Sequence, residues 1–190
     1  YLWNEAAQVL EPHAWHGRGD WMREVRFRLG EGLTGVVAQR REGMVVNDYQ
    51  RWPGASRFSL ARAQITAALA EPLMYGDRFL GVLTVNNEGP ARPFTDRDRA
   101  FVALFAAQAA LAIENARLFG EVSRAKTEWE NTFDSISDLV AVLDMQGRIV
   151  RANRALLRRL GRIGQGVAVL GLALYLNRSH WSWLKLLYLP

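Results

Sequence analysis

The chain has 190 residues, 49% of them hydrophobic, and a formal net charge of +5, so it is long enough to bury the core of one domain or of two small ones. It contains no cysteine, which excludes disulfides, thiolate metal sites and thiol nucleophiles and favours a cytoplasmic protein. The charge is uneven, because residues 1–122 hold 14 basic and 14 acidic side chains, whereas eight Arg or Lys and no acid follow Asp144. The basic pI therefore describes one end of the chain and predicts no nucleic-acid partner.

The sequence predicts neither a signal peptide nor a membrane partner. It begins at Tyr1, without a basic segment followed by an apolar one. Its longest uncharged stretch, 163–177, is shorter than the roughly 20 apolar residues that a membrane helix needs. We therefore expect a soluble fragment of a larger protein.

The first predicted elements belong to a mixed fold. Apolar and charged residues alternate over 21–29, which is the pattern of a strand with one wet face in an antiparallel sheet. Three glycines then predict a turn over 30–35, a short helix over 36–40 and a second strand over 44–47.

A hairpin is expected in the centre of the sheet. Residues 48–66 lack periodicity and predict a long loop with one short helix, the kind of connection that often carries binding residues. Two apolar strands follow over 67–75 and 79–87, and Gly76 and Asp77 between them supply the chemistry of a tight turn.

A long helix is predicted from Thr95, because Thr95 and Asp98 form a capping box. Heptad spacing from position 101 predicts that the helix pairs with a second copy of itself, which makes a homodimer. The seam residues are Phe101, Leu104, Gln108, Leu111, Asn115, Leu118 and Val122. A neighbouring stripe of Phe105, Ala112 and Phe119 is predicted to pack on the sheet.

The last readable elements indicate a second domain. A strand over 138–144, a turn over 145–147 and a strand over 148–152 precede Asn153, which is placed to cap a helix over 154–160. Residues 161–190 show neither alternation nor a capped helical face.

Residues 1–121 resemble a GAF domain that lacks its opening helix. The resemblance rests on several motifs in order: LGEGLTG at 29–35, VND at 46–48, EPL at 71–73, GVL at 81–83, FTD at 94–96 and AALAIENARL at 109–118. It implies an α+β fold with an antiparallel sheet and a long C-terminal signalling helix.

Residues 133–160 resemble the start of a PAS domain, on the motifs WENTFDSI at 129–136 and NRA at 153–155. Residues 122–132 are then a helical linker. The tail over 161–190 is atypical of the family, and a truncated or frame-shifted reading frame is one explanation for it.

Two motifs compete with this interpretation. Gly30, Gly32 and Gly35 match a dinucleotide fingerprint, but the charged strand before them does not suit a buried parallel sheet, so a tight turn is preferred. The order Asn86, Phe94, Asp98 resembles the signature of cyclic-nucleotide-binding GAF domains. Because Asn87 and Arg99 replace its lysine and glutamate, we interpret these residues as structural.

The GAF resemblance implies a small-molecule pocket between the sheet and the loop after position 48. Aromatic walls with a polar anchor suit such a site, and Arg57 is a candidate to hold an anion. The predicted lining is Trp52, Arg57, Phe58, Ile65, Leu83 and Val85. The ligand is unknown, and no metal or cofactor is expected, since the three histidines lack supporting carboxylates.

The sequence thus predicts a sensory module without catalytic residues, which senses a small molecule or relays a signal through its dimer to an output domain outside the chain. A sensor histidine kinase is the favoured parent, and a regulator of a nucleotide cyclase or a transcription factor is the alternative. Arginines recurring from Arg148 to Arg162 leave a nucleic-acid-binding regulator as another class, although a solvated helix face is preferred.

Overall fold

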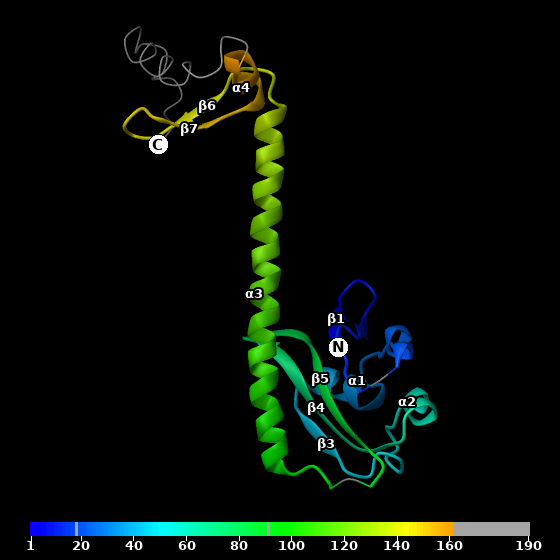
Figure 1. Cartoon of the computed structure of the whole chain (residues 1–190). Coiled ribbons are helices and arrows are strands. Elements are labelled where there is room, and N and C mark those ends of the chain that lie inside the picture. Colours follow the sequence, from blue (N-terminus) through cyan, green and yellow to red (C-terminus); the bar gives the residue numbers. More distant parts are fainter. Residues whose placement is uncertain (18, 91, 162–190) are drawn as a thin grey trace. The chain divides into compact units, whose positions relative to one another are not determined.

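The computed structural model describes residues 1–17, 19–90 and 92–161, and the chain forms two compact units, Tyr1–Leu118 and Phe119–Pro190. The first unit is an α+β domain with a five-stranded antiparallel sheet, in the strand order β2-β1-β5-β4-β3 (Figure 1). The strands are β1 Leu2–Asn4, β2 Val9–Glu11, β3 Met44–Val46, β4 Ile65–Tyr75 and β5 Arg78–Glu88.

The predicted hairpin is confirmed as the β4–β5 pair, the longest ladder of the sheet. Gly76 in its turn has a φ of 56°, in the left-handed region where glycine has no steric penalty. The predicted strand over 44–47 is β3, and the loop after it contains one short helix, α2 Arg57–Arg62, as expected.

The strand predicted over 21–29 is wrong. The 3-10 helix η1, Asp20–Glu24, stands there instead, followed by a single bridge between Phe27 and Leu10. Val25 and Phe27 are buried as the alternation implies, but the Val25 N–H is bonded to the Met22 carbonyl and cannot join a ladder. The alternation of apolar and charged residues therefore reflects which side chains are buried and does not indicate a strand.

The three-glycine turn leads directly into helix α1, Gly32–Arg40, which begins four residues before its predicted start. Gly30 and Gly32 have φ values of 79° and 61°, and a side chain at Gly35 would overlap the Arg28 carbonyl oxygen. The glycines are therefore required by a tight turn and its close packing. α1 covers one face of the sheet, where Val37 packs with Ala68, Ala70 and Val82.

Helix α3, Asp96–Ser135, packs its first half on the opposite face. The predicted sheet-facing stripe is wrong: Phe105 and Phe119 are 57% and 77% exposed, and Ala112 is also exposed. Ala106 and Ala110 are buried against Leu73 and Leu80 instead. Small side chains at these positions let the helix approach the sheet closely.

Two ion pairs fix α3 on this face. Arg99 donates to the buried Glu71 on β4 at 2.9 Å, and Arg78 on β5 donates to the buried Glu114 at 3.1 Å. Arg117 and Arg78 hold the pKa of Glu114 below its ordinary value. A side chain at Gly43 would overlap the Glu71 carboxylate, so this acid fills the space that the glycine leaves.

The second unit contains the β6–β7 hairpin, Ala141–Leu143 and Ile149–Ala152, and helix α4, Arg154–Gly161. The predicted cap is confirmed, since the Asn153 Oδ1 accepts from the Leu156 N–H at 3.0 Å. Asn153 is fully buried; its Oδ1 also accepts from Val140, and its amide donates to the carbonyls of Ile136 and Asp138. The expectation for 162–190 lies outside the described residues.

Candidate functional site

A cavity of about 760 Å³ lies in the first unit, at β5, η1, the first turn of α1 and the segment before η1. Its volume is within the roughly 300–1,000 Å³ of small-molecule sites. The lining residues that bear on its chemistry are Trp15, His16, Trp21, Phe27, Thr34, Tyr49, Thr84, Asn86 and Glu88. The cavity thus combines aromatic walls with several hydrogen-bonding groups.

Three of the six residues predicted for the pocket line this cavity, namely Ile65, Leu83 and Val85. Leu83 also packs on the α3 side, against the cluster of Ala106 and Ala110.

The other three predicted residues do not line the cavity. Trp52 packs on Tyr49 with ring centroids 5.9 Å apart, and Phe58 packs on Trp21 at 5.7 Å. Both therefore lie behind residues that do line the cavity. Arg57 is exposed at the start of α2.

The sequence analysis missed the polar residues of β5. The alternation of side chains along β5 could have identified them. Side chains two positions apart in a strand share a face, so Thr84 and Asn86 lie on the same face as the buried Val82. The contribution of Trp15 and His16 had no comparable signal, because residues 12–17 form neither helix nor strand.

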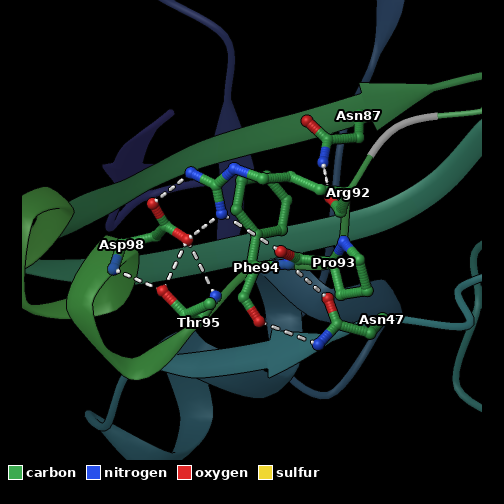
Figure 2. A network of polar contacts seen from close by, with 7 residues as sticks. All are labelled: Asn47, Asn87, Arg92, Pro93, Phe94, Thr95 and Asp98. Atoms are coloured by element: carbon green, nitrogen blue, oxygen red, sulfur yellow. Dashed lines mark hydrogen bonds and ion pairs between the residues drawn. The ribbon is translucent and has the colours of Figure 1, made fainter.

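The start of α3 is held by a network of polar contacts (Figure 2). The capping box is confirmed: the Asp98 carboxylate accepts from the Thr95 N–H at 2.8 Å, and the Thr95 hydroxyl accepts from the Asp98 N–H at 3.2 Å. Arg92 forms a bidentate pair with Asp98 at 2.6 and 2.7 Å. Arg92, followed by Thr95, lowers the pKa of Asp98 far below its ordinary value.

The same network ties this segment to β5 and to the exit of β3. The Asn87 amide of β5 donates to the Arg92 carbonyl at 2.9 Å. After β3, Asn47 donates to the Phe94 carbonyl at 2.9 Å and accepts from the Phe94 N–H at 2.7 Å (Figure 2). Phe94 and Asp98, which match the nucleotide signature, and Asn87, which stands at its lysine position, are thus occupied by structural contacts.

The predicted seam of α3 lies away from the sheet. Its apolar members are exposed: Phe101 61%, Leu104 68%, Leu111 43%, Leu118 42% and Val122 69%. Gln108 and Asn115 are exposed with them. α3 therefore carries an exposed stripe of five apolar residues, with two polar residues, Gln108 and Asn115, among them.

Comparison with known proteins agrees with this architecture. A model of the GAF domain matches residues 4–114, and a model of the PAS domain matches residues 127–187, a range that extends beyond the predicted end of the PAS segment at 160. The two families together indicate a sensory or signalling module.

Solved GAF domains share the fold. The GAF domain of a phosphoenolpyruvate-protein phosphotransferase from Acinetobacter is 28% identical, with a TM-score of 0.54 over 64% of this chain and 72% of that one. The corresponding domain from Coxiella burnetii is 24% identical, with a TM-score of 0.56 over 63% and 72%. The GAF-B domain of DevS from Mycobacterium smegmatis is 20% identical, with a TM-score of 0.52 over 64% and 82%.

Proposed function

Since this chain belongs to the GAF domain family, we propose that it senses a small molecule in the cavity at β5 and passes the change to α3. The observation that carries the proposal is the position of the cavity. Two of its lining residues lie within two positions of the residues that hold the start of α3.

The first connection runs through the end of β5. Asn86 lines the cavity, and the next residue, Asn87, holds the Arg92 carbonyl. The Thr66 hydroxyl of β4 donates to the Gly89 carbonyl at 2.9 Å, with the Asn87 carbonyl at 3.3 Å as a second, weaker acceptor, so the end of β5 is held to β4. A ligand that pulls on Asn86 would therefore act on the segment leading to α3.

The second connection runs through the loop after β3. Tyr49 lines the cavity, and its N–H donates to the Thr66 carbonyl at 2.9 Å. Two residues earlier, Asn47 holds Phe94 by two hydrogen bonds. Both connections end on residues 92–95, immediately before α3, and this convergence supports a relay from the cavity to the helix.

We further propose that α3 pairs with its copy in a homodimer through the seam and transmits a shift toward the PAS segment. The exposed apolar stripe supports this pairing, because the five apolar residues among its seven a and d positions would otherwise face water. Gln108 and Asn115 would set the register. Such a relay requires two states of the helix pair.

The output domain would belong to the parent protein, and a sensor histidine kinase is the parent that we favour. A regulator of a nucleotide cyclase or of transcription would use the same sensory unit. A nucleic-acid-binding role for the basic end has no support from the contacts of Arg148 and Arg151, which pair with Asp144 and Glu130 at 2.7 Å each.

We place the protein in the cytoplasm, without a membrane partner. Within 1–17, 19–90 and 92–161, α3 is the one helix long and apolar enough to cross a membrane by length and composition. We assign the apolar surface of α3 instead to the sheet, where Ala106 and Ala110 are buried, and to the proposed seam, which is exposed.

The full chain purified under native conditions tests the proposal. Mass spectrometry should detect a retained small molecule, and removing that molecule should speed amide hydrogen exchange at 92–98. In Asn87→Ala the exchange response should shrink while the molecule is still retained. The matched control, Asn131→Ala on α3, should respond like the parent chain. Absence of any retained molecule, together with no response to added compounds, would refute sensing at this cavity.

A further inference from the structure

The end of α3 is attached to the segment between β7 and α4 of the second unit by two hydrogen bonds, which we call the anchor. The Asp134 carboxylate accepts from the Arg154 N–H at 3.0 Å, and the Asn153 amide donates to the Ile136 carbonyl at 3.0 Å. Asn153 is fully buried, so losing its bonds would leave polar groups without partners. The anchor is therefore a lasting attachment.

Arg151 on β7 holds α3 at a second point, a helical turn before the anchor. Its guanidinium pairs with the Glu130 carboxylate at 2.7 Å, and its Cζ lies 4.4 Å from the centroid of the Trp129 ring. The Trp129 ring stacks in turn on the buried Phe133, with centroids 5.2 Å apart. A planar guanidinium suits both contacts, because it pairs with a carboxylate and also lies against an aromatic face. We call Arg151, Glu130 and Trp129 the clamp.

The clamp is only partly buried, unlike Asn153. The side chains of Arg151 and Glu130 are 38% and 34% exposed, and Trp129 is 48% exposed. Ion pairs at such positions contribute little to stability, since water and salt screen them. Lys126, a turn earlier on α3, lies 4.0 Å from the same Glu130 oxygen. The carboxylate therefore keeps a cationic neighbour when Arg151 leaves, and the clamp can open while the anchor stays intact.

We propose that the clamp is the element through which the second unit receives a shift of α3. In one state Glu130 pairs with Arg151, so α3 is held at two points a turn apart, which fixes its rotation about its own axis. In the other state Glu130 pairs with Lys126 and only the anchor remains. Arg151 pairs with Val142 in the β6–β7 ladder, so closing or opening the clamp acts on both strands. This inference rests on the proposed relay along α3 and names the residues on which that relay acts.

NMR of the full chain tests the two states of the clamp. The Nε–H signal of Arg151, assigned as the one lost in Arg151→Lys, should be shifted upfield by the Trp129 ring. Trp129→Leu and Glu130→Gln should each move it toward the position of an exposed arginine, and Lys126→Gln, which removes the competing cation, should move it further upfield. Arg124→Gln, at an exposed residue of α3 outside the clamp, should leave it in place. A signal that none of the three clamp variants moves would overturn the proposal.

Hydrogen exchange of the full chain tests whether the clamp transmits a shift. Gln108→Leu with Asn115→Leu alters the proposed seam and is the input, and exchange over 141–152 is the readout. We expect a change of about threefold, the ratio for opening an exposed ion pair. Arg151→Ala should largely abolish this response, and Arg151→Lys, which keeps the charge, should reduce it. The matched control Arg158→Ala, at an exposed residue of α4, should respond like the parent chain.

The outcomes separate the clamp from the relay. An undiminished response over 141–152 in Arg151→Ala would overturn the clamp and leave the relay along α3 intact. No response in the parent chain would refute the relay, and with it the role of the clamp. Circular dichroism and thermal melting show whether each variant keeps its fold, and Arg151→Lys decides the question if Arg151→Ala does not fold.

Discussion

Asn47 and Phe94 exchange two hydrogen bonds, although 47 positions separate them: the Asn47 amide donates to the Phe94 carbonyl and accepts from the Phe94 N–H. A side-chain amide thus stands in for a neighbouring strand and satisfies both backbone groups of Phe94. The segment that starts α3 is attached to the exit of β3 by this single residue.

Asn47→Ala should therefore loosen the start of α3. We expect a loss of about 1 kcal/mol in the free energy of unfolding of the first unit, since the two bonds are exposed. Hydrogen exchange at 92–98 should become faster. Asn47→Asp keeps the acceptor for the Phe94 N–H and should give a smaller effect, so an equal loss in both variants would contradict the two-bond account.

The pH dependence of stability should report Asp98. Its pKa is lowered in the folded chain, chiefly by Arg92 and then by Thr95, so it stabilises the fold above its unfolded pKa of about 3.9. This contribution is lost as the pH falls through the lower folded pKa. Denaturant unfolding of the parent chain and of Asp98→Asn should differ most above about pH 4, and the difference should shrink steadily as the pH falls from there toward the lower folded pKa. A difference that stays the same between pH 7 and pH 2.5 would show that Asp98 acts through another contact.

Two glycines should respond oppositely to alanine. Gly35→Ala places a methyl group against the Arg28 carbonyl oxygen and should cost about 2 kcal/mol, because the backbone must move. Gly120→Ala meets nothing within 4 Å and lies inside α3, so it should add about 1 kcal/mol. Thermal melting of the two variants compares them directly, and a stabilised Gly35→Ala would refute the tight packing.

Asn153→Ala should unfold the second unit first. It removes one side chain that serves the N–H groups of Val140 and Leu156 and the carbonyls of Ile136 and Asp138. We expect a loss of about 3 kcal/mol, from the missing cap and the buried groups left without partners. Exchange should accelerate over 138–157 and stay unchanged over 65–88. Uniform acceleration in both regions would contradict a local role.

The seam is tested by replacing its polar positions. Gln108→Leu with Asn115→Leu should strengthen self-association, because buried polar residues specify register at a cost in stability. Sedimentation velocity over a concentration series should show a tighter dimer than the parent chain. Leu104→Ser and Leu111→Ser should weaken the dimer. Identical sedimentation of all three proteins would show that the seam is misassigned.

The elements that could be predicted are those set by local chemistry. The glycine turn of β4–β5, the Thr95–Asp98 box and the Asn153 cap each depend on residues within a few positions of one another. The GAF resemblance, which depends on the order of such motifs, was confirmed for the same reason.

The errors concern contacts between distant segments. The sheet-facing side of α3 was assigned to large apolar residues, whereas the structure uses Ala106 and Ala110, whose small size carries no strong pattern. The cavity depends on Trp15 and His16, which tertiary packing brings toward β5. The strand predicted over 21–29 is absent because the Val25 N–H donates to the nearby Met22 carbonyl and is not available to a neighbouring strand.

Gly43, Glu71 and Arg99 form a set in which a change at one position alters the contacts of the others. Any side chain at Gly43 would displace the Glu71 carboxylate, and losing that carboxylate would leave Arg99 without its partner on the sheet. Losing Arg99 alone would instead leave the buried carboxylate of Glu71 without its ion-pair partner. Among homologues of this domain, the three positions should therefore covary, and a bulkier residue at the first should accompany a shorter or neutral residue at the second.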